Sequence, residues 1–294
     1  MRLSVESIRA RRSVRTYDGA PLSKAEEAGL RASFAEAVPG PFGATPRFIL
    51  ASRDEVEESA ADDSTAKGRV RIGTYGMIVG PRAFIAGVVA KRPLACVDFG
   101  YCLEGIVLRA TELGLGSCWI GGVFGRGAIA KAMEAGKEEF VPATTPIGHA
   151  ARRPSLQERL VASGSGARTR KAPSELFFQA APGGAIEPLV DSGAWADILE
   201  AVRIGPSASN KQPWRLVLDR RGGGEALHLL MHEDERYNNM LGDVKLQELD
   251  MGIAMRHVEI AASELGIQGA WRRLDADPIE LEVPRRYIAS FVRV

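Results

Sequence analysis

Residues 98–119 (DFGYCLEGIVLRATELGLGSCW) and 250–271 (DMGIAMRHVEIAASELGIQGAW) read as two copies of one segment. They align without a gap and share Asp, Gly, Ala, Glu-Leu-Gly and Trp at matching positions. In each copy the apolar residues recur at intervals of three, four and seven, which is typical of one buried helix face. Each predicted helix ends at Leu-Gly, because glycine suits the left-handed position that follows a helix. The chain is therefore predicted to contain two related halves.

The composition is that of a soluble globular protein. The 294 residues suffice for two ordinary domains, and 45% of them are apolar and 26% charged. The net charge of +1 argues against a nucleic-acid or membrane surface, and no apolar run reaches the roughly 18 residues of a spanning helix. Three sparse cysteines and a start without the apolar run of a secretory signal predict a reducing compartment, which we expect to be the cytoplasm.

The order of predicted elements is similar in the two halves. In the first half we expect helices at 5–11, 23–37 and 128–133 and strands at 48–51, 83–89, 117–120 and 142–147. In the second half we expect a helix at 195–202 and strands at 214–218, 227–231 and 287–294. The segment 181–185, rich in Gly and Pro, is the predicted join, with halves at 1–180 and 186–294. Because strands and helices do not alternate regularly, the predicted fold class is α+β.

Two motifs carry basic side chains. Arg11-Arg12-Ser13-Val14-Arg15 offers guanidinium groups and a hydroxyl, the donors that a phosphate needs, although a solvated helix end would look the same. Arg168-Thr169-Arg170-Lys171 follows a loop of Gly, Ser and Arg, where basic residues are often simply solvated. Both runs are candidate phosphate contacts.

Two further motifs are suited to a flat ligand. The loop Gly205 to Trp214 (GPSASNKQPW) contains Asn and Gln amides, which can hydrogen-bond to a heteroaromatic edge. The segment Gly114 to Gly122 (GLGSCWIGG) ends in two glycines, which allow backbone N–H groups to approach a ligand closely, or which form a tight turn. A metal site is not expected, because the four histidines and three cysteines show no ligand-like spacing.

Together the four motifs resemble the FMN-dependent nitroreductase family. The string Pro-Ser-x-x-Asn-x-Gln-Pro-Trp is the most specific part of the resemblance, but here it comes last in the chain instead of second. Family members are dimers in which each subunit carries every motif. Here the motifs are divided between the two halves of one chain. The chain therefore resembles a fused, single-chain subgroup in which one polypeptide imitates the dimer. The resemblance implies mixed or antiparallel sheets flanked by helices, with the two halves forming a pseudo-dimer.

The resemblance also implies which residues bind the flavin. Four segments would form one composite site between the halves. They are the arginine turn (residues 11–15), the glycine strand end (119–122), the late basic pair (168 and 170) and the covering loop (205–214). The implied residues are Arg11, Arg12, Ser13, Arg15, Trp119, Ile120, Gly121, Gly122, Arg168, Arg170, Pro206, Ser207, Ala208 and Asn210. Ala208 departs from the serine common in the family loop, which removes one possible hydroxyl contact.

A second flavin site is not expected. The equivalent first-half loop, Pro39 to Pro46, lacks Ser-x-x-Asn, and the second half has Trp271-Arg272-Arg273 where the first has Trp119 to Gly122. The resemblance thus implies one FMN per chain and a monomer that supplies its own pseudo-dimer.

The implied activity is that of an FMN-dependent NAD(P)H oxidoreductase. A reduced nicotinamide would pass hydride to flavin N5, and a small organic acceptor, nitroaromatic or quinone-like, would then take it in a ping-pong cycle. No catalytic side chain is expected, but Arg15 is the candidate for stabilising charge at N1 and O2. Two alternatives stay open: another flavin reaction on the same scaffold, such as dehydrogenation or reductive dehalogenation, and a non-enzymatic flavin-binding protein.

Overall fold

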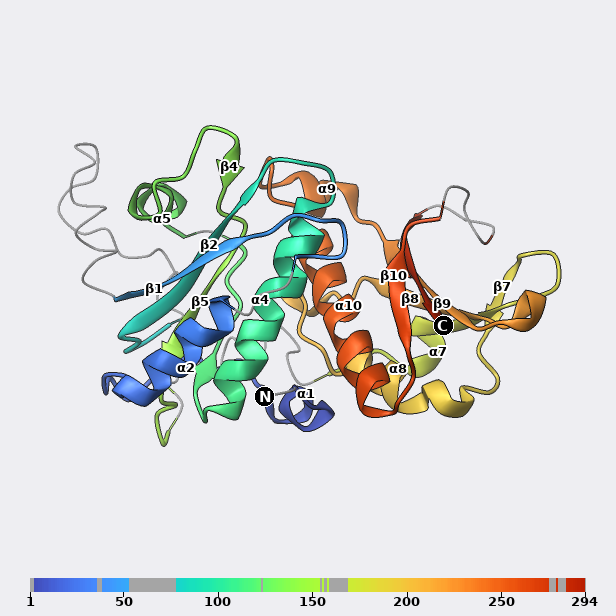
Figure 1. Ribbon diagram of the computed structural model, residues 1–294, viewed down its shortest axis with the longest axis horizontal. Coiled ribbons are helices and arrows are strands. Elements are labelled where there is room, and N and C mark those ends of the chain that lie inside the picture. Colours follow the sequence, from blue (N-terminus) through green and yellow to red (C-terminus); the bar gives the residue numbers. More distant parts are fainter. Residues whose placement is uncertain are drawn as a thin grey trace.

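The chain folds around two β-sheets that lie at opposite ends of its long axis (Figure 1). A computed structural model describes residues 3–35, 39–52, 78–122, 124–153, 155, 158, 169–274, 279 and 284–293. The predicted surface segment 55–67 and most of the predicted loop 163–170 lie outside these ranges. In the described part of the chain, no helix combines the length and apolarity required to cross a bilayer.

The first sheet is antiparallel. Its strands are β1 (Arg47–Ser52), β2 (Ala83–Ala90), β5 (Thr144–Gly148) and β3 (Gly116–Ser117), in that spatial order, and β4 (Glu139–Phe140) also pairs with β2. Strands β1, β2 and β5 confirm their predictions. The predicted strand at 117–120 is shorter, because after β3 only Ile120 returns to the sheet, in a bridge to Thr144.

The second sheet repeats this order. Strands β8 (Trp214–Asp219), β9 (Ala226–His232), β11 (Arg285–Arg293) and β10 (Gly269–Arg272) lie side by side and pair antiparallel. They correspond in chain order and in neighbours to β1, β2, β5 and β3. The two sheets are therefore built to one plan, as the repeated segment predicts.

Two strands that were not predicted extend the second sheet. Strand β6 (Phe177–Ala180) pairs parallel with β8, and β7 (Ile186–Pro188) pairs antiparallel with β6. The predicted join at 181–185 forms the turn between them, closed by the Ala181 N–H on the Ala185 carbonyl at 2.8 Å. Residues before that join thus reach across to the second sheet. The division into 1–180 and 186–294 stays a prediction.

The repeated segments form the two central helices, α4 (Ala95–Glu112) and α10 (Leu246–Glu264), which pack against each other between the sheets (Figure 1). Gly100 and Gly252 occupy the same position in the two copies. A Cβ on Gly100 would lie 2.2 Å from the Leu249 carbonyl oxygen, and one on Gly252 would lie 2.0 Å from that of Val97. Each glycine thus lets the partner backbone approach, so the contact is reciprocal and has the approximate twofold symmetry of a dimer interface.

Shorter helices cover the sheets. They are α1 (Val5–Ala10), α2 (Lys24–Ala35), α5 (Arg126–Ala132), α7 (Pro173–Leu176), α8 (Ala196–Arg203) and α9 (Glu235–Asn239), with 3-10 turns at Gly193–Trp195, Ala208–Asn210 and Arg221–Gly223. The predicted capping box opens α2: the Glu26 carboxylate accepts from the Ser23 N–H, and the Ser23 hydroxyl oxygen accepts from the Glu26 N–H.

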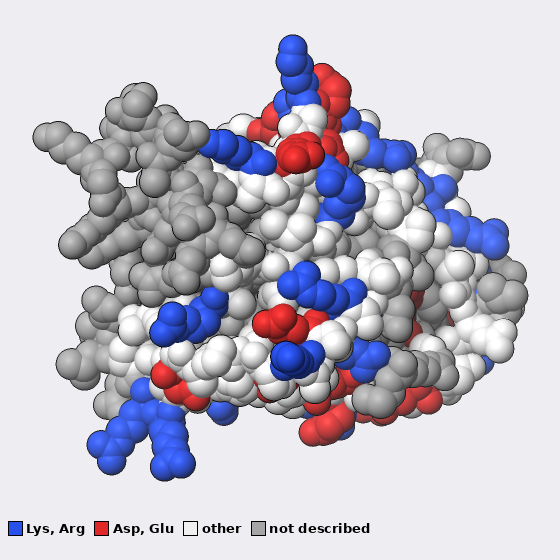
Figure 2. Space-filling model, turned by 60° about the vertical axis from the view of Figure 1, so that its left-hand side comes forward, with Lys and Arg blue, Asp and Glu red and all other residues white. Residues whose placement is uncertain are grey.

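Helix α1 connects the halves. It contacts α4 of the first half and both α8 and α10 of the second, and its Val5 and Ile8 join the core of the second sheet. The residues that follow α1 therefore emerge at the boundary between the halves. On the face seen in Figure 2, basic and acidic side chains are interspersed.

Candidate functional site

The arginine motif leaves α1 as an extended segment beside the first sheet. Arg11 ends the helix, and its N–H donates to the Ser7 carbonyl. Ser13 then bridges in parallel to Ser117 of β3, with the Val14 N–H donating to the Ser117 carbonyl at 2.8 Å. This pairing brings the motif next to the strand that leads to Trp119 and the two glycines.

The Arg11 guanidinium is enclosed at the boundary between the halves. Its Nη1 atom is buried and has no hydrogen-bond partner among the described residues. Burial lowers the pKa of Arg11, opposed mainly by the Glu104 carboxyl group. A buried, unsatisfied guanidinium nitrogen is costly and indicates a place for an anion that the polypeptide does not supply.

A second guanidinium, that of Arg170, lies near enough to Arg11 for their charges to interact. Arg170 donates through Nη2 to the carbonyl of Ile204, where α8 ends, and through Nη1 to Asn210 Oδ1 at 3.3 Å. Burial lowers the pKa of Arg170, and the positive charge of Arg11 lowers it further. The two cations therefore repel each other, and an anion between them would relieve the repulsion.

The covering loop is held in an unusual conformation. Ser209, Asn210 and Gln212 all have positive φ, between 48° and 52°, which is uncommon for residues other than glycine. The Ala208 N–H donates to Asp250 Oδ1, and the Gln212 N–H donates to the Ser207 hydroxyl, both at 2.9 Å. These bonds hold the loop in place before any ligand arrives.

The glycine strand end exposes backbone donors. Arg126 binds the carbonyls of Gly121 and Gly122 through Nη2 and Nη1, at 2.7 and 2.6 Å. In the described part of the chain the N–H groups of these two glycines have no acceptor. A Cβ on Gly121 would lie 2.7 Å from Leu246 Cδ2 of α10, whereas Gly122 has open space. Their N–H groups are thus available to a ligand.

A buried polar network joins the halves behind these segments. The fully buried Glu104 accepts from Trp119 Nε1 at 2.7 Å and lies 3.0 Å from His257 Nε2. His257 Nδ1 lies 2.8 Å from the Ala201 carbonyl oxygen, which can only accept. Glu104 on α4 and His257 on α10 thus form a fully buried hydrogen-bonded pair between the two central helices.

The predicted residues do not all converge. Arg11, Arg170 and Asn210 come together, but Arg12 is exposed and Arg168 lies outside the described residues. Arg15 is half-buried, and its charge acts on the Cys118 thiol. The other predicted residues lie on the two segments described above, the glycine strand end and the covering loop.

Sequence reasoning missed four residues that support the site. Glu104 and Asp250 lie on the repeated helices, where polar residues at buried positions were the available signal, and Gln212 belonged to the recognised motif. Its amide oxygen accepts from the Lys171 N–H at 2.9 Å and so joins the late basic run to the covering loop. Cys118 lies in the recognised segment Gly114 to Gly122, but no role was assigned to it. Burial raises the pKa of this thiol, and Arg15 and Arg11 oppose that rise.

Asp98 and Asp250 hold equivalent loops. Asp98 accepts from the N–H groups of Phe42 and Ala44 through its two oxygens, at 2.8 and 2.7 Å. Asp250 binds only Ala208, and its buried Oδ2 has no partner in the described part of the chain. Both halves thus use an aspartate on the central helix to hold the loop, but among the described residues both carboxylate oxygens accept hydrogen bonds only in the first half.

We expect Asp250→Asn to change the pH dependence of stability. Burial holds the pKa of Asp250 well above its ordinary value. The unfolded chain loses this proton near pH ~4 while the folded chain keeps it, so the wild type loses stability as pH rises from there to the folded-state pKa. Asparagine does not titrate, so the variant should gain on the wild type over that range, by up to about 1.4 kcal/mol per pH unit. Urea unfolding of both proteins at several pH values measures this, and a pH-independent difference would contradict it.

Comparisons with known proteins agree with the fold. Residues 4–262 match the model of a family described as "Putative TM nitroreductase". The crystal structure of a "putative nitroreductase" from Thermotoga maritima is similar over 100% of this chain and 94% of its own, with a TM-score of 0.55 and 15% identity. An "FMN-dependent Nitroreductase" from Clostridium difficile R20291 is 18% identical, with a TM-score of 0.39, over 53% of this chain and 94% of its own. No curated protein matches the chain.

Proposed function

The chain belongs to the nitroreductase family whose model it matches over residues 4–262, and we propose that it is an FMN-dependent oxidoreductase that uses NAD(P)H to reduce a small organic acceptor. The observation that carries the cofactor assignment is the buried, unsatisfied Nη1 of Arg11 beside a second guanidinium, that of Arg170. Two converging guanidiniums suit a phosphate, because they can donate several charge-assisted hydrogen bonds to one group.

The rest of the site suits the flavin ring. The free N–H groups of Gly121 and Gly122 can donate toward ring N5 and O4, and the Pro206 to Asn210 loop of the other half can cover the ring. When bound, FMN supplies hydride transfer through its N5 atom. We assign Arg15 the stabilisation of negative charge at N1 and O2, because a cation already in place needs no reorganisation during the reaction.

The halves differ in a way that supports one FMN per chain. On the second half, Arg272 and Arg273 stand where the first half has Ile120 and Gly121, and Arg272 lies in the regular strand β10. An arginine side chain there replaces the open backbone of the glycine turn. The position opposite it, the first-half loop from Gly40 to Ala44, is tied to Asp98 and offers no Ser-x-x-Asn side chains.

The test is the flavin content and turnover of the purified protein. After loading with FMN and removal of unbound flavin, the absorbance spectrum should give one FMN per chain, and the loaded protein should oxidise NADH or NADPH when an acceptor is added. Two FMN per chain would contradict the single composite site. No flavin retained would contradict the cofactor, and retained flavin without NAD(P)H oxidation would contradict the activity.

We expect Arg11→Ala to weaken FMN binding about tenfold to a hundredfold. The variant loses a charge-assisted phosphate contact of roughly 1.5–3 kcal/mol. Quenching of flavin fluorescence during titration of the apoprotein measures the Kd. Arg9→Ala is the matched control, because Arg9 lies on α1 just before Arg11, and its side chain, which is 53% exposed, forms a surface ion pair with Asp197 at 3.8 Å. Equal affinities for the two variants would remove the phosphate assignment.

A further inference from the structure

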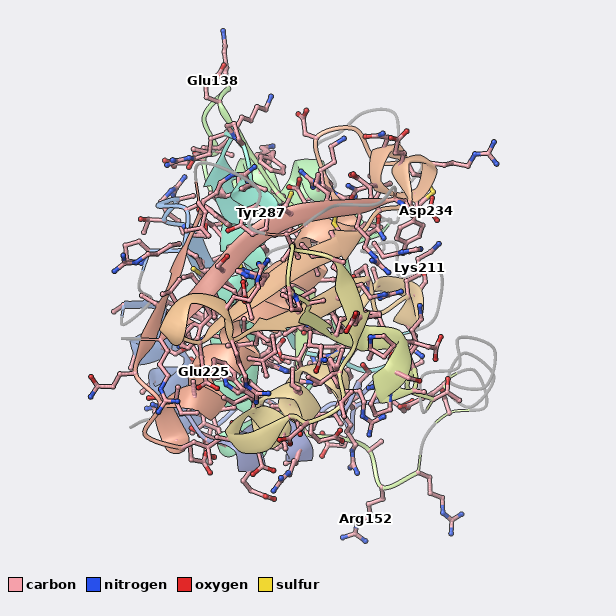
Figure 3. The ribbon with its side chains drawn as sticks, turned by 90° about the vertical axis from the view of Figure 1, so that its right-hand side faces the viewer. Glu138, Arg152, Lys211, Glu225, Asp234 and Tyr287 are labelled. Atoms are coloured by element: carbon pink, nitrogen blue, oxygen red, sulfur yellow. The ribbon has the colours of Figure 1, made fainter. Side chains whose placement is uncertain are left out.

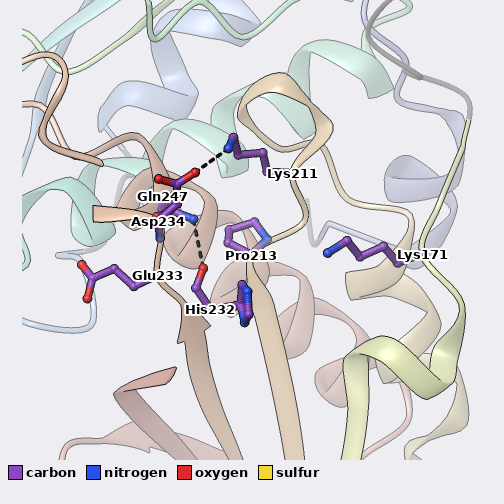
Figure 4. Close-up of a pocket in the computed structure, with 7 residues that line it drawn as sticks. All are labelled: Lys171, Lys211, Pro213, His232, Glu233, Asp234 and Gln247. Atoms are coloured by element: carbon purple, nitrogen blue, oxygen red, sulfur yellow. Dashed lines mark hydrogen bonds and ion pairs between the residues drawn. The ribbon is translucent and has the colours of Figure 1, made fainter. Parts of the chain in front are cut away.

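A cavity of about 480 Å³ lies beside the covering loop, on residues that the proposed flavin site does not use (Figure 4). We call it the Lys171 cavity. It is lined by Lys171, Lys211, Pro213, His232, Glu233, Asp234 and Gln247. Lys171 and Lys211 each follow a residue of the flavin site, Arg170 and Asn210, so the cavity adjoins that site along both segments.

The acidic residues of the cavity are already engaged. Asp234 pairs with Lys211 Nζ through Oδ2 at 2.7 Å and caps α9 by accepting from the Tyr237 N–H through Oδ1. Figure 3 shows Lys211 and Asp234 close together at the edge of the second half. Glu233 accepts from Asn238 and lies 3.5 Å from the Arg286 Nε. The lining therefore has no carboxylate left to balance a further cation.

Two basic groups of the lining lack such a partner. The Lys171 ammonium forms no hydrogen bond or ion pair within the described residues, and Figure 4 shows it extending into the cavity toward Pro213 and His232. Gln247 donates to the His232 carbonyl, and the imidazole ring of His232, an exposed residue, lines the cavity. One ammonium and one imidazole thus converge on the same space.

The surrounding charges add to this positive field. Burial lowers the pKa of Lys171, and the positive charge of Arg215 lowers it further, whereas the carboxyl group of Glu175 raises it. Partial loss of solvent around the exposed His232 also lowers its pKa. The positive charges of Arg215, Lys171 and Arg285 lower it further, and Asp234 opposes them. Arg215 is buried and donates to the carbonyls of Gln212 and Trp214, which are neutral and do not cancel its charge. The groups around the cavity therefore repel one another, and a bound anion would relieve that repulsion.

We propose that the Lys171 cavity binds the phosphate group of a small phosphate ester. The unpaired ammonium and the imidazole can both donate to phosphate oxygens, and the buried Arg215 supplies long-range attraction. The volume lies in the range of small-molecule sites, so the cavity has room for part of the organic group as well as the phosphate. The ester is either the 2′-phosphate end of the nicotinamide cofactor or a separate phosphorylated compound.

Titration of the protein with inorganic phosphate, followed by proton NMR of the histidines, tests the site. The chain has four histidines, so His232→Gln identifies the signal of His232. At constant ionic strength, phosphate should move this signal in a saturable way and raise the pKa of His232. In Lys171→Gln the phosphate concentration needed for half the change should rise about tenfold or more. Lys137→Gln, at an exposed lysine outside the cavity, is the control and should match the wild type.

The readout separates this proposal from the flavin proposal. Phosphate bound between Arg11 and Arg170 would not depend on Lys171, so the response of His232 should persist in Arg11→Ala. If the His232 signal does not move, or if it moves equally in Lys171→Gln and Lys137→Gln, the cavity is not a phosphate site. A protein that binds no FMN but keeps the Lys171-dependent response would contradict only the proposed function.

Steady-state kinetics then identifies the source of the phosphate. This experiment rests on the proposed function, because it needs turnover of NADH and NADPH. If the cavity takes the 2′-phosphate of NADPH, Lys171→Gln should raise KM for NADPH about tenfold and leave KM for NADH unchanged. If both KM values stay unchanged while the His232 response depends on Lys171, the ligand is a separate phosphate ester. An equal rise for both reductants would show general damage to the site, and it would overturn the proposal.

Discussion

Glu104→Ala should lower the free energy of unfolding by about 2–6 kcal/mol, because it removes the shared hydrogen-bond partner of two groups, and a buried group left without its partner costs about 1–3 kcal/mol. The variant leaves His257 Nε2 and Trp119 Nε1 without their partner and removes the carboxyl group that acts on Arg11. Because Glu104 lies on α4 and His257 on α10, the variant weakens the contact between the two halves. Urea unfolding at neutral pH measures it.

Two further variants test whether the loss comes from the buried hydrogen bonds of Glu104 and not from the loss of side-chain volume or of a negative charge. Glu104→Gln keeps the volume and one acceptor, so it should cost less than Glu104→Ala. Glu200→Ala removes the partner of Arg203 in an ion pair whose side chains are 24% and 41% exposed, so it should change stability by at most about 1 kcal/mol. If Glu104→Ala costs no more than Glu200→Ala, the buried network does not hold the halves together.

Gly252→Ala should destabilise the protein by about 2–3 kcal/mol, although replacing glycine by alanine within a helix usually stabilises it by up to about 1 kcal/mol. The added Cβ would lie 2.0 Å from the Val97 carbonyl oxygen and 2.5 Å from the Tyr101 nitrogen. These are backbone atoms and cannot rotate away, so α4 and α10 must move apart. Urea denaturation gives the change.

Gly105→Ala is the matched control within α4. The nearest atom to its new Cβ would be Nε of Arg256, at 3.2 Å, at the end of a flexible side chain. We expect stability within about 1 kcal/mol of the wild type, with a gain possible from the helix preference of alanine. Similar losses in the Gly105 and Gly252 variants would show that the close approach of the two helix backbones is not what makes Gly252 necessary.

The two halves share a scaffold but differ in the polar residues that they place on it. Glu104 and Arg256 are equivalent in the repeat, yet Glu104 is fully buried with His257, whereas Arg256 lies over the ring of Tyr101 near the surface. Gly121 likewise corresponds to Arg273. The differences fall where a second flavin site would lie, in keeping with the proposal of one site per chain.

Much of the scaffold was predictable because its signals are local. Periodic apolar residues and the Leu-Gly ends located α4 and α10, and the capping box located the start of α2. Strands β6 and β7 were missed because the Gly-Pro turn at 181–185 was interpreted as a join. Strand β6 pairs with β8, which lies more than 30 residues away in the sequence, as the partners Phe177 and Leu216 show, and β7 pairs with β6. Local sequence carries no record of the contact with β8.

The sequence by itself determined the two-helix repeat, the α+β class and the motifs that could bind a flavin, because periodicity and motif spacing are properties of neighbouring residues. Only the tertiary structure decided which of those residues meet. It placed the guanidiniums of Arg11 and Arg170 together, left Arg12 exposed and buried Glu104 against His257. The physical reason is that burial and charge repulsion arise between segments far apart in the chain, and these segments meet only once α4 and α10 pack.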